Sequence, residues 1–252
     1  MKRISSFYPN SELAASGAPD EKELKILSKW QDHLHKDVFG PAYTPARNTT
    51  RRDLRKNLRK ASGLLKDAGW VIQNGQRIHA KTGKEFSFEI ILNDTKKEKI
   101  GLALIRNLKK LGIKASLRVL DSSAFIGRLN NYDYDMALHY WHSTLSPGTE
   151  QILFWGCEAA KQPARWNYAG ICNKAVDSLS RHIAHSKTRE ELVTLTRTLD
   201  RALTHGHYMT PLFYRGEDWL SYWRFLKAPV ATPIYGIVQE SWWQNPKNTD
   251  IH

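Results

Sequence analysis

Histidine side chains are the first candidates for chemistry in this sequence. They occur in four close pairs: His33/His35, His139/His142, His182/His185 and His205/His207. His182 and His185 stand three residues apart in a predicted helix, a spacing that lets two imidazoles share a metal ion. No third ligand is identifiable near them. A solvated helix face is therefore the favoured interpretation, and we predict no metal site.

Two serines beside His142 offer a second kind of chemistry. Ser143 and Ser146 could each pair with this histidine as a nucleophile with its general base. The sequence supplies neither an acid to orient the imidazole nor an oxyanion hole. It also lacks the glycine-rich phosphate loops, the nucleophile elbow and the paired-cysteine and paired-histidine motifs. We therefore predict that the chain is not an enzyme, has no catalytic residues and uses no cofactor.

The residues around His142 are better suited to binding. Tyr140, Trp141, His142, Ser143 and Thr144 follow an apolar segment that is predicted as a sheet strand. Open α/β sheets bind ligands at the carboxyl ends of their strands, where these side chains would lie. The alternative is that the two aromatic residues only cover the core, and the sequence fits both interpretations equally well.

Alternating helix and strand patterns are expected to position this segment. Apolar residues at helical spacing predict helices over 53–68 and 96–111, and Asn74-Gly75 predicts a hairpin turn. Strands are predicted at 86–92 and 115–119. Because a helix connects them, these two strands should be parallel, with a right-handed crossover.

The second half of the chain shows one more strand and two more helices. The strand is predicted at 134–139, and the second helix begins with the capping box Thr188-x-x-Glu191. Between them, 143–172 shows no regular period, and an irregular loop of that length is usually functional. An edge strand is predicted at 209–214.

Composition and charge limit the function classes. The chain has 252 residues, 41% of them apolar, and a net charge of +13, so it can build a core, and disorder is excluded. Residues 47–66 and 96–118 each hold eight basic side chains and one acid. Such blocks favour either a nucleic-acid-binding module or the exposed faces of two amphipathic helices, and the helical spacing favours the latter.

Several segments resemble one protein family. Asn57–Trp70, NLRKASGLLKDAGW in one-letter code, resembles a segment of the bacterial extracellular solute-binding proteins of family 5, the peptide-binding subunits of ABC importers. Asn10–Pro19 and Tyr132–Met136, the latter followed by Trp141, are similar to two more family segments. Three others resemble the branch linked to microcin C and oligopeptide uptake: Ser146–Gln151, Phe154–Gly156 and Asn167–Ile171.

The resemblance implies a fold and a domain organisation. It implies the C-terminal lobe of a type II (cluster C) periplasmic binding protein, an α/β lobe with a mixed sheet and flanking helices. Residues 1–46, with a helix predicted at 20–34, would lead in from the first lobe and hinge. Residues 47–218 would form the second lobe, and 219–252 would return to the first lobe.

The resemblance also implies site residues. Family peptide contacts come from the segment that aligns with Trp141–Thr144, and Asn167 and Tyr168 are expected at the same site. Several oligopeptide binders use an aspartate at the position of Thr144 to bind the peptide's ammonium group. With threonine there, we expect main-chain hydrogen bonds and stacking on Trp141. In an oxidising periplasm, Cys157 and Cys172 could form a disulfide across the long loop.

The implied partners are a peptide or peptide-like ligand, an inner-membrane ABC permease and the N-terminal lobe, with the chain a monomer. A cleft closes only between two lobes, so this chain alone is expected to bind weakly or not at all. The family location is the periplasm, although the basic N-terminus lacks a signal peptide's apolar region, which favours the cytoplasm for the isolated chain. The other readings are a nucleic-acid-binding module and a truncated remnant without function.

Overall fold

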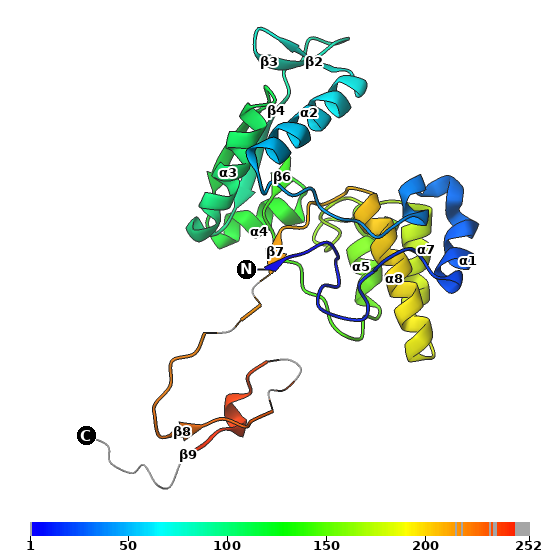
Figure 1. Ribbon diagram of the computed structural model, residues 1–252, viewed down its shortest axis with the longest axis vertical. Coiled ribbons are helices and arrows are strands. Elements are labelled where there is room, and N and C mark those ends of the chain that lie inside the picture. The colour runs from blue at the N-terminus through cyan, green and yellow to red at the C-terminus, as the bar shows by residue number, and fades with distance from the viewer. Residues whose placement is uncertain (1, 215, 218, 232, 234–235, 245–252) are drawn as a thin grey trace. The chain divides into compact units, whose positions relative to one another are not determined.

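The computed structural model describes residues 2–214, 216–217, 219–231, 233 and 236–244 (Figure 1). The chain divides into two compact units, Met1–Ile4 with Leu212–His252, and Ser5–Pro211. The predicted lobe boundaries at 46/47 and 218/219 differ from these unit boundaries. The assignment of either flanking segment to a lobe stays a prediction, and residues 245–252 lie outside the described part.

The larger unit contains most of the regular structure. Its helices are α1 (Glu21–Leu27), α2 (Arg51–Asp67), α3 (Glu98–Lys109), α4 (Ser122–Asn130), α5 (Glu150–Trp155), α6 (Cys157–Ala160), α7 (Lys174–Ala184) and α8 (Arg189–His205), with 3-10 turns η1 (Ser28–His33), η2 (Lys36–Phe39) and η3 (Thr95–Lys97). Its strands are β2 (Trp70–Gln73), β3 (Gln76–His79), β4 (Ser87–Leu92), β5 (Lys114–Val119) and β6 (Met136–Ala137).

The smaller unit consists of short elements and loops. They are β1 (Lys2–Arg3), β7 (Phe213–Tyr214), β8 (Leu226–Lys227), η4 (Gln239–Ser241) and β9 (Trp243–Gln244). The strands pair antiparallel as β1–β7 and β8–β9. Of the edge strand predicted at 209–214, only the two residues of β7 form a strand, which pairs with β1.

A parallel three-stranded sheet, in the order β5–β4–β6, lies in the larger unit. β4 pairs with β5 along its whole length, and α3, which connects them, packs on β5. The predicted parallel βαβ unit is thus confirmed, as is the α/β class. The prediction of a mixed sheet is wrong for the described residues, because the hairpin at Asn74-Gly75 pairs β2 with β3 in a sheet of its own.

Local capping explains where α2 begins and ends. The Thr50 hydroxyl accepts a hydrogen bond from the Asp53 amide, and the Asp53 carboxylate accepts one from the Thr50 amide. After the helix, Gly69 takes the left-handed conformation that glycine adopts without strain, at φ +85°. No side chain of α2 is fully buried, so its basic residues form an exposed face.

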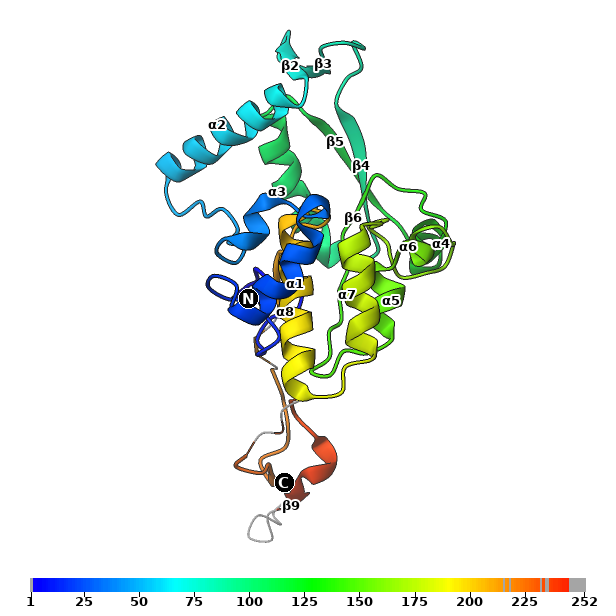
Figure 2. The ribbon, with the colours of Figure 1, turned by 90° about the vertical axis from the view of Figure 1, so that its right-hand side faces the viewer.

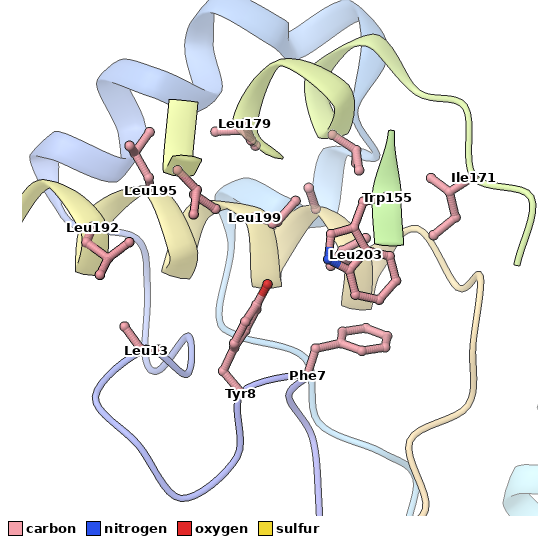
Figure 3. Packing of buried hydrophobic residues seen from close by; sticks show 13 residues of the cluster. Phe7, Tyr8, Leu13, Trp155, Ile171, Leu179, Leu192, Leu195, Leu199 and Leu203 are labelled. Carbon is pink, nitrogen blue, oxygen red and sulfur yellow. The ribbon is translucent and has the colours of Figure 1, made fainter. Parts of the chain in front are cut away.

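Helices α1, α5, α7 and α8 enclose the main core. Figure 2 shows them side by side, in agreement with their contacts. Trp155, Leu199 and Leu203 lie at the centre, and the N-terminal segment adds Phe7 and Tyr8 to the same cluster (Figure 3). Residues far apart in the sequence therefore build one core.

Three predictions of element length need correction. The helix predicted over 20–34 ends at Leu27, where the chain turns into η1, and Trp30 there leaves helical geometry at φ −122°. The strand predicted over 134–139 pairs only at Met136 and Ala137. The segment 143–172 is not irregular throughout, because α5 buries Gln151 and Trp155 one helical turn apart and α6 follows it.

Candidate ligand-binding site

The carboxyl ends of β4 and β6 meet at one edge of the sheet. The two strands run parallel, and the amide of Leu138 extends their ladder by donating to the Ile91 carbonyl oxygen at 3.0 Å. The chain then leaves the sheet with His139 and Tyr140. Asn93 follows the last residue of β4, so side chains from two strand ends converge here.

Lys97 projects into this edge from η3. Its Nζ donates to Asn93 Oδ1 at 3.0 Å and lies 4.3 Å from the centroid of the Tyr140 ring, a cation–π distance. The Lys97 side chain is half-buried, whereas Tyr140 is 66% exposed. Within the described ranges, no carboxylate lies within ion-pair distance of Lys97.

An aromatic cluster continues from this edge toward the core. We use that name for His139, Trp141, Phe154, Trp155, Trp166 and Tyr168. The Trp141 ring stacks on Trp155 with centroids 4.7 Å apart, and Phe154 meets Trp141 edge-on at 4.9 Å. Tyr168 meets His139 edge-on at 5.0 Å. The cluster places one half-buried indole, Trp141, between the sheet edge and the core.

The segment 156–172 is fastened internally. Asn167 is fully buried, and its Nδ2 donates to the carbonyl oxygens of Gly156 and Ile171 while its Oδ1 accepts from the Ile171 amide. In the structure, a disulfide joins Cys157 to Cys172. The Tyr168 carbonyl oxygen accepts a hydrogen bond from the Tyr134 hydroxyl, so this segment is also tied to the sheet edge.

Positive charge and desolvation act together on His139. Its pKa lies below the ordinary value for histidine, chiefly because neighbouring atoms partly desolvate the ring, and further because of the charges of Lys97 and of a protonated His142. The neutral imidazole is therefore favoured near pH 7. Burial likewise raises the pKa of the Tyr134 hydroxyl, to about 12, so this group stays a hydrogen-bond donor.

The structure brings only some of the predicted site residues together. Tyr140, Trp141 and Tyr168 lie at or beside the sheet edge, whereas the amide hydrogens of Asn167 are already donated inside its own loop. The next three residues of the predicted segment are exposed and irregular: His142, Ser143 and Thr144.

Three residues of this edge were missed from the sequence, Asn93, Lys97 and His139. The signal for Lys97 was present, because the predicted parallel strands bring their carboxyl ends together. A residue shortly after the strand at 86–92 should therefore face a residue shortly after the strand at 134–139. His139 was instead placed inside the second of these strands, which ends two residues earlier than predicted.

The described residues hold neither a membrane-spanning helix nor a cluster of metal ligands. None of the helices there combines the length and apolar character needed to cross a membrane. In the same part of the chain, no three His, Cys, Asp or Glu side chains lie close enough together to hold a metal ion.

Comparison with known families assigns the chain. Residues 22–162 match the family described as bacterial extracellular solute-binding proteins, family 5, middle part. The chain belongs to this family. Proteins of family 5 are binding proteins and not enzymes, and their fold is that of binding proteins. The family's name places them outside the cytoplasm.

Two similar bacterial proteins show how much of a relative this chain spans. The chain is 40% identical over 243 residues to the protein y4wM of Sinorhizobium fredii, and 38% identical over 247 residues to the probable peptide-binding protein YejA of Agrobacterium fabrum. Each alignment covers 96% of this chain, but only 37% and 40% of those two proteins. The chain thus spans about two fifths of the length of its relatives.

Solved structures of family 5 proteins share the fold. The oligopeptide-binding protein AppA of Bacillus subtilis, solved with a nonapeptide, superposes with a TM-score of 0.60 at 21% identity, covering 88% of this chain and 45% of AppA. An oligopeptide transporter's periplasmic binding protein from Thermotoga maritima, bound to mannohexaose, gives 0.56 at 18% identity, covering 81% and 36%. These matches show a type II periplasmic binding protein fold.

Proposed function

We propose that this chain forms the ligand-binding lobe of a substrate-binding subunit of an ABC importer for peptides or peptide-like compounds. The observation that carries the proposal is the exposed Tyr140 and half-buried Trp141 at the carboxyl edge of a parallel sheet, in a family of solute-binding proteins. The peptide class is supported by the relative YejA, which is named a probable peptide-binding protein.

In this proposal the lobe contributes one wall of the site. Tyr140 and Trp141 give apolar surface, and the main chain of the exposed residues 142–144 gives hydrogen-bonding groups that suit many peptide sequences. Asn167 and the Cys157–Cys172 disulfide hold Tyr168 in place rather than contact the ligand. A second lobe supplies the opposite wall, and the loaded protein meets a permease at the inner membrane, from the periplasm.

An NMR titration of the chain with trialanine tests the site. We expect millimolar affinity, because one lobe makes only part of the contacts, with amide shifts at residues 139–144 and at Tyr168. Trp141→Leu should weaken binding, whereas Trp219→Leu, at an indole that is 82% exposed in the smaller unit, should not. Unchanged spectra at millimolar trialanine would contradict the site, and micromolar affinity would contradict the need for a second lobe.

A further inference from the structure

A mostly buried histidine, His205, ends α8 on the far side of the helical core from the candidate site's residues in sequence. Only 8% of its surface is exposed, and within the described part of the chain its Nε2 atom has no hydrogen-bond partner. A protonated imidazole carries a hydrogen on each ring nitrogen. Protonation would therefore leave a charged N–H group buried at Nε2 without an acceptor, which is costly.

The rings around His205 come from two segments. Tyr43 meets it edge-on with centroids 6.1 Å apart, and the same tyrosine meets His207 at 6.0 Å. His207 in turn lies 6.2 Å from the ring of His35. Three imidazoles and a tyrosine thus gather where residues 35–43, which include η2, lie against the end of α8. We call residues 35–43 the latch segment.

Contacts that do not titrate near neutral pH also hold the latch segment. Arg201, one turn before His205 in α8, donates to the Gly40 carbonyl oxygen at 3.3 Å, and the Ala42 amide donates to the Gly17 carbonyl oxygen at 2.8 Å. Val38 is fully buried. The pH-dependent part of the attachment is therefore the contact with the imidazoles.

The charges that face His205 come from both sides of this contact. On and after α8 they are Arg201, which is paired with the buried Glu23, and His207. From the latch segment Asp37 faces the ring, and its carboxylate lies 3.5 Å from Nδ1 of His35.

Burial sets the sign of the titration. It lowers the pKa of His205 below the ordinary value of 6.5, and the charges of His207 and Arg201 lower it further, although Asp37 and a hydrogen bond to the Pro41 backbone raise it. The uncharged ring therefore favours the attached segment above pH 6.5, and this contribution is lost as the pH falls below that value.

We propose that His205 is a pH-sensitive latch: when its imidazole is protonated, residues 35–43 detach from the end of α8 and Nε2 reaches water. These residues lie in the connection from α1 and η1 to α2. Acid would thus loosen the link between the helical core and the half of the larger unit that begins with α2. The inference does not depend on the ligand and goes beyond the proposed function.

Amide hydrogen exchange of the full chain, followed by NMR, measures the detachment. The probes are the amides of Val38, Gly40 and Ala42, which donate to carbonyl oxygens within the latch segment or at Gly17. We expect their protection factors, corrected for the intrinsic exchange rate, to fall by about five- to thirtyfold between pH values of about 7.5 and 5. The upper limit is that of a group with a pKa of 6.5 in the detached segment that stays uncharged in the attached one.

Variants assign the change to one imidazole. His205→Asn is uncharged throughout this range and keeps a side-chain N–H donor, so its protection factors should be equal at both pH values. His207→Asn is the matched control: His207 is exposed and has φ +53°, a conformation that asparagine tolerates, and most of the change should remain. Every other group that titrates in this range is present in both variants.

Equal protection of the wild type at both pH values would overturn the proposal. A change that persists in His205→Asn, or that disappears in His207→Asn, would overturn it as well, because another group would then carry the effect. If His205→Asn were already detached at pH 7.5, NMR titration of the wild-type His205 ring decides. A pKa below 6.5 would support the latch, and one at or above 6.5 would contradict it.

Discussion

Asp200 is a carboxylic acid inside the helical core. Only 1% of its surface is exposed, and its two oxygens accept hydrogen bonds from the amides of Phe7 and Ala15 at 2.8 and 2.9 Å. Burial raises its pKa from 3.8 to about 6, although these amides and the nearby Arg201 lower it. The residue therefore fastens the N-terminal segment to α8 while making stability depend on pH.

Stability should fall as the pH rises from about 4 to about 7. The folded protein holds the Asp200 proton up to about pH 6, whereas the unfolded chain releases it near 3.8, so below pH 6 the proton favours the folded state. The contribution lost across this window is on the order of 3 kcal/mol. The test is to measure the free energy of unfolding of the wild type and of Asp200→Asn at pH values of about 4 and about 7. The stability of the wild type relative to the variant should be lower at the higher pH.

An exposed carboxylate provides the control for this prediction. Asp67→Asn, at the end of α2, should alter the pH dependence of the free energy of unfolding far less than Asp200→Asn does, because the Asp67 side chain is exposed. If the difference between wild type and Asp200→Asn were the same at pH values of about 4 and 7, the proton would not be linked to folding.

At the scale of elements, Gly112 and Gly63 differ in the space that each leaves for an added Cβ atom. Gly112 links α3 to β5 at φ +76°, and a Cβ there would lie 2.8 Å from the Ile72 Cδ1 atom and 3.0 Å from the Gly75 carbonyl oxygen. Gly63 lies inside α2, where an added Cβ would meet nothing within 4 Å. The same substitution should therefore have opposite effects.

Gly112→Ala should destabilise the protein by about 1–3 kcal/mol, because alanine would be strained at this φ and would press on the hairpin. Gly63→Ala should stabilise it by about 0.5–1 kcal/mol, since alanine is the better helix former. Urea unfolding measures both. A loss of stability in Gly63→Ala would mean that α2 is covered by a surface that the added methyl disturbs.

Elements with a strong local signal could be predicted from the sequence. The Asn74-Gly75 turn, the apolar spacing of the helix predicted at 53–68 and the Thr188 cap of α8 each depend on neighbours along the chain, and all three are found. β6 was predicted too long because its end depends on pairing with Ile90 and Ile91, far away in sequence. α5 was missed because its buried face is two residues, Gln151 and Trp155, among aromatics that follow no helical period.

The candidate site shows the same limit. Tyr140 and Trp141 could be named because aromatics after a strand are visible in one short segment. The approach of Lys97 to Tyr140 depends on how η3 begins after β4, which no periodic pattern records. Asn167 was predicted at the ligand site, but its loop-internal hydrogen bonds are visible only in three dimensions.

At the scale of the whole molecule, the net charge of +13 is concentrated on two helices and their flanks. The basic residues of α2 lie on its exposed face, as expected for an amphipathic helix, and this placement alone does not distinguish a nucleic-acid surface. Membership of an extracellular family favours a solvated face. The two interpretations differ in how binding responds to salt.

We expect no binding of duplex DNA at 50 mM salt or above, measured by fluorescence anisotropy. Exposed lysines and arginines on separate helices do not by themselves form a base-reading surface. Tight binding that falls steeply with salt, and that is lost when Arg55 and Arg59 are both changed to Gln, would revive the nucleic-acid interpretation. The charge-conserving pair Arg55→Lys with Arg59→Lys is its control.

The hydrogen bonds that the amides of Phe7 and Ala15 donate to Asp200 also set an order of events during synthesis. They join residues 193 and 185 positions apart, so the segment that carries Phe7 emerges from the ribosome long before its partner helix exists. At about 5–20 residues per second this interval lasts roughly 10–40 s. During that time the core that buries Phe7, Tyr8 and Leu13 has not formed. We expect these exposed apolar side chains to bind a chaperone until α8 has been synthesised.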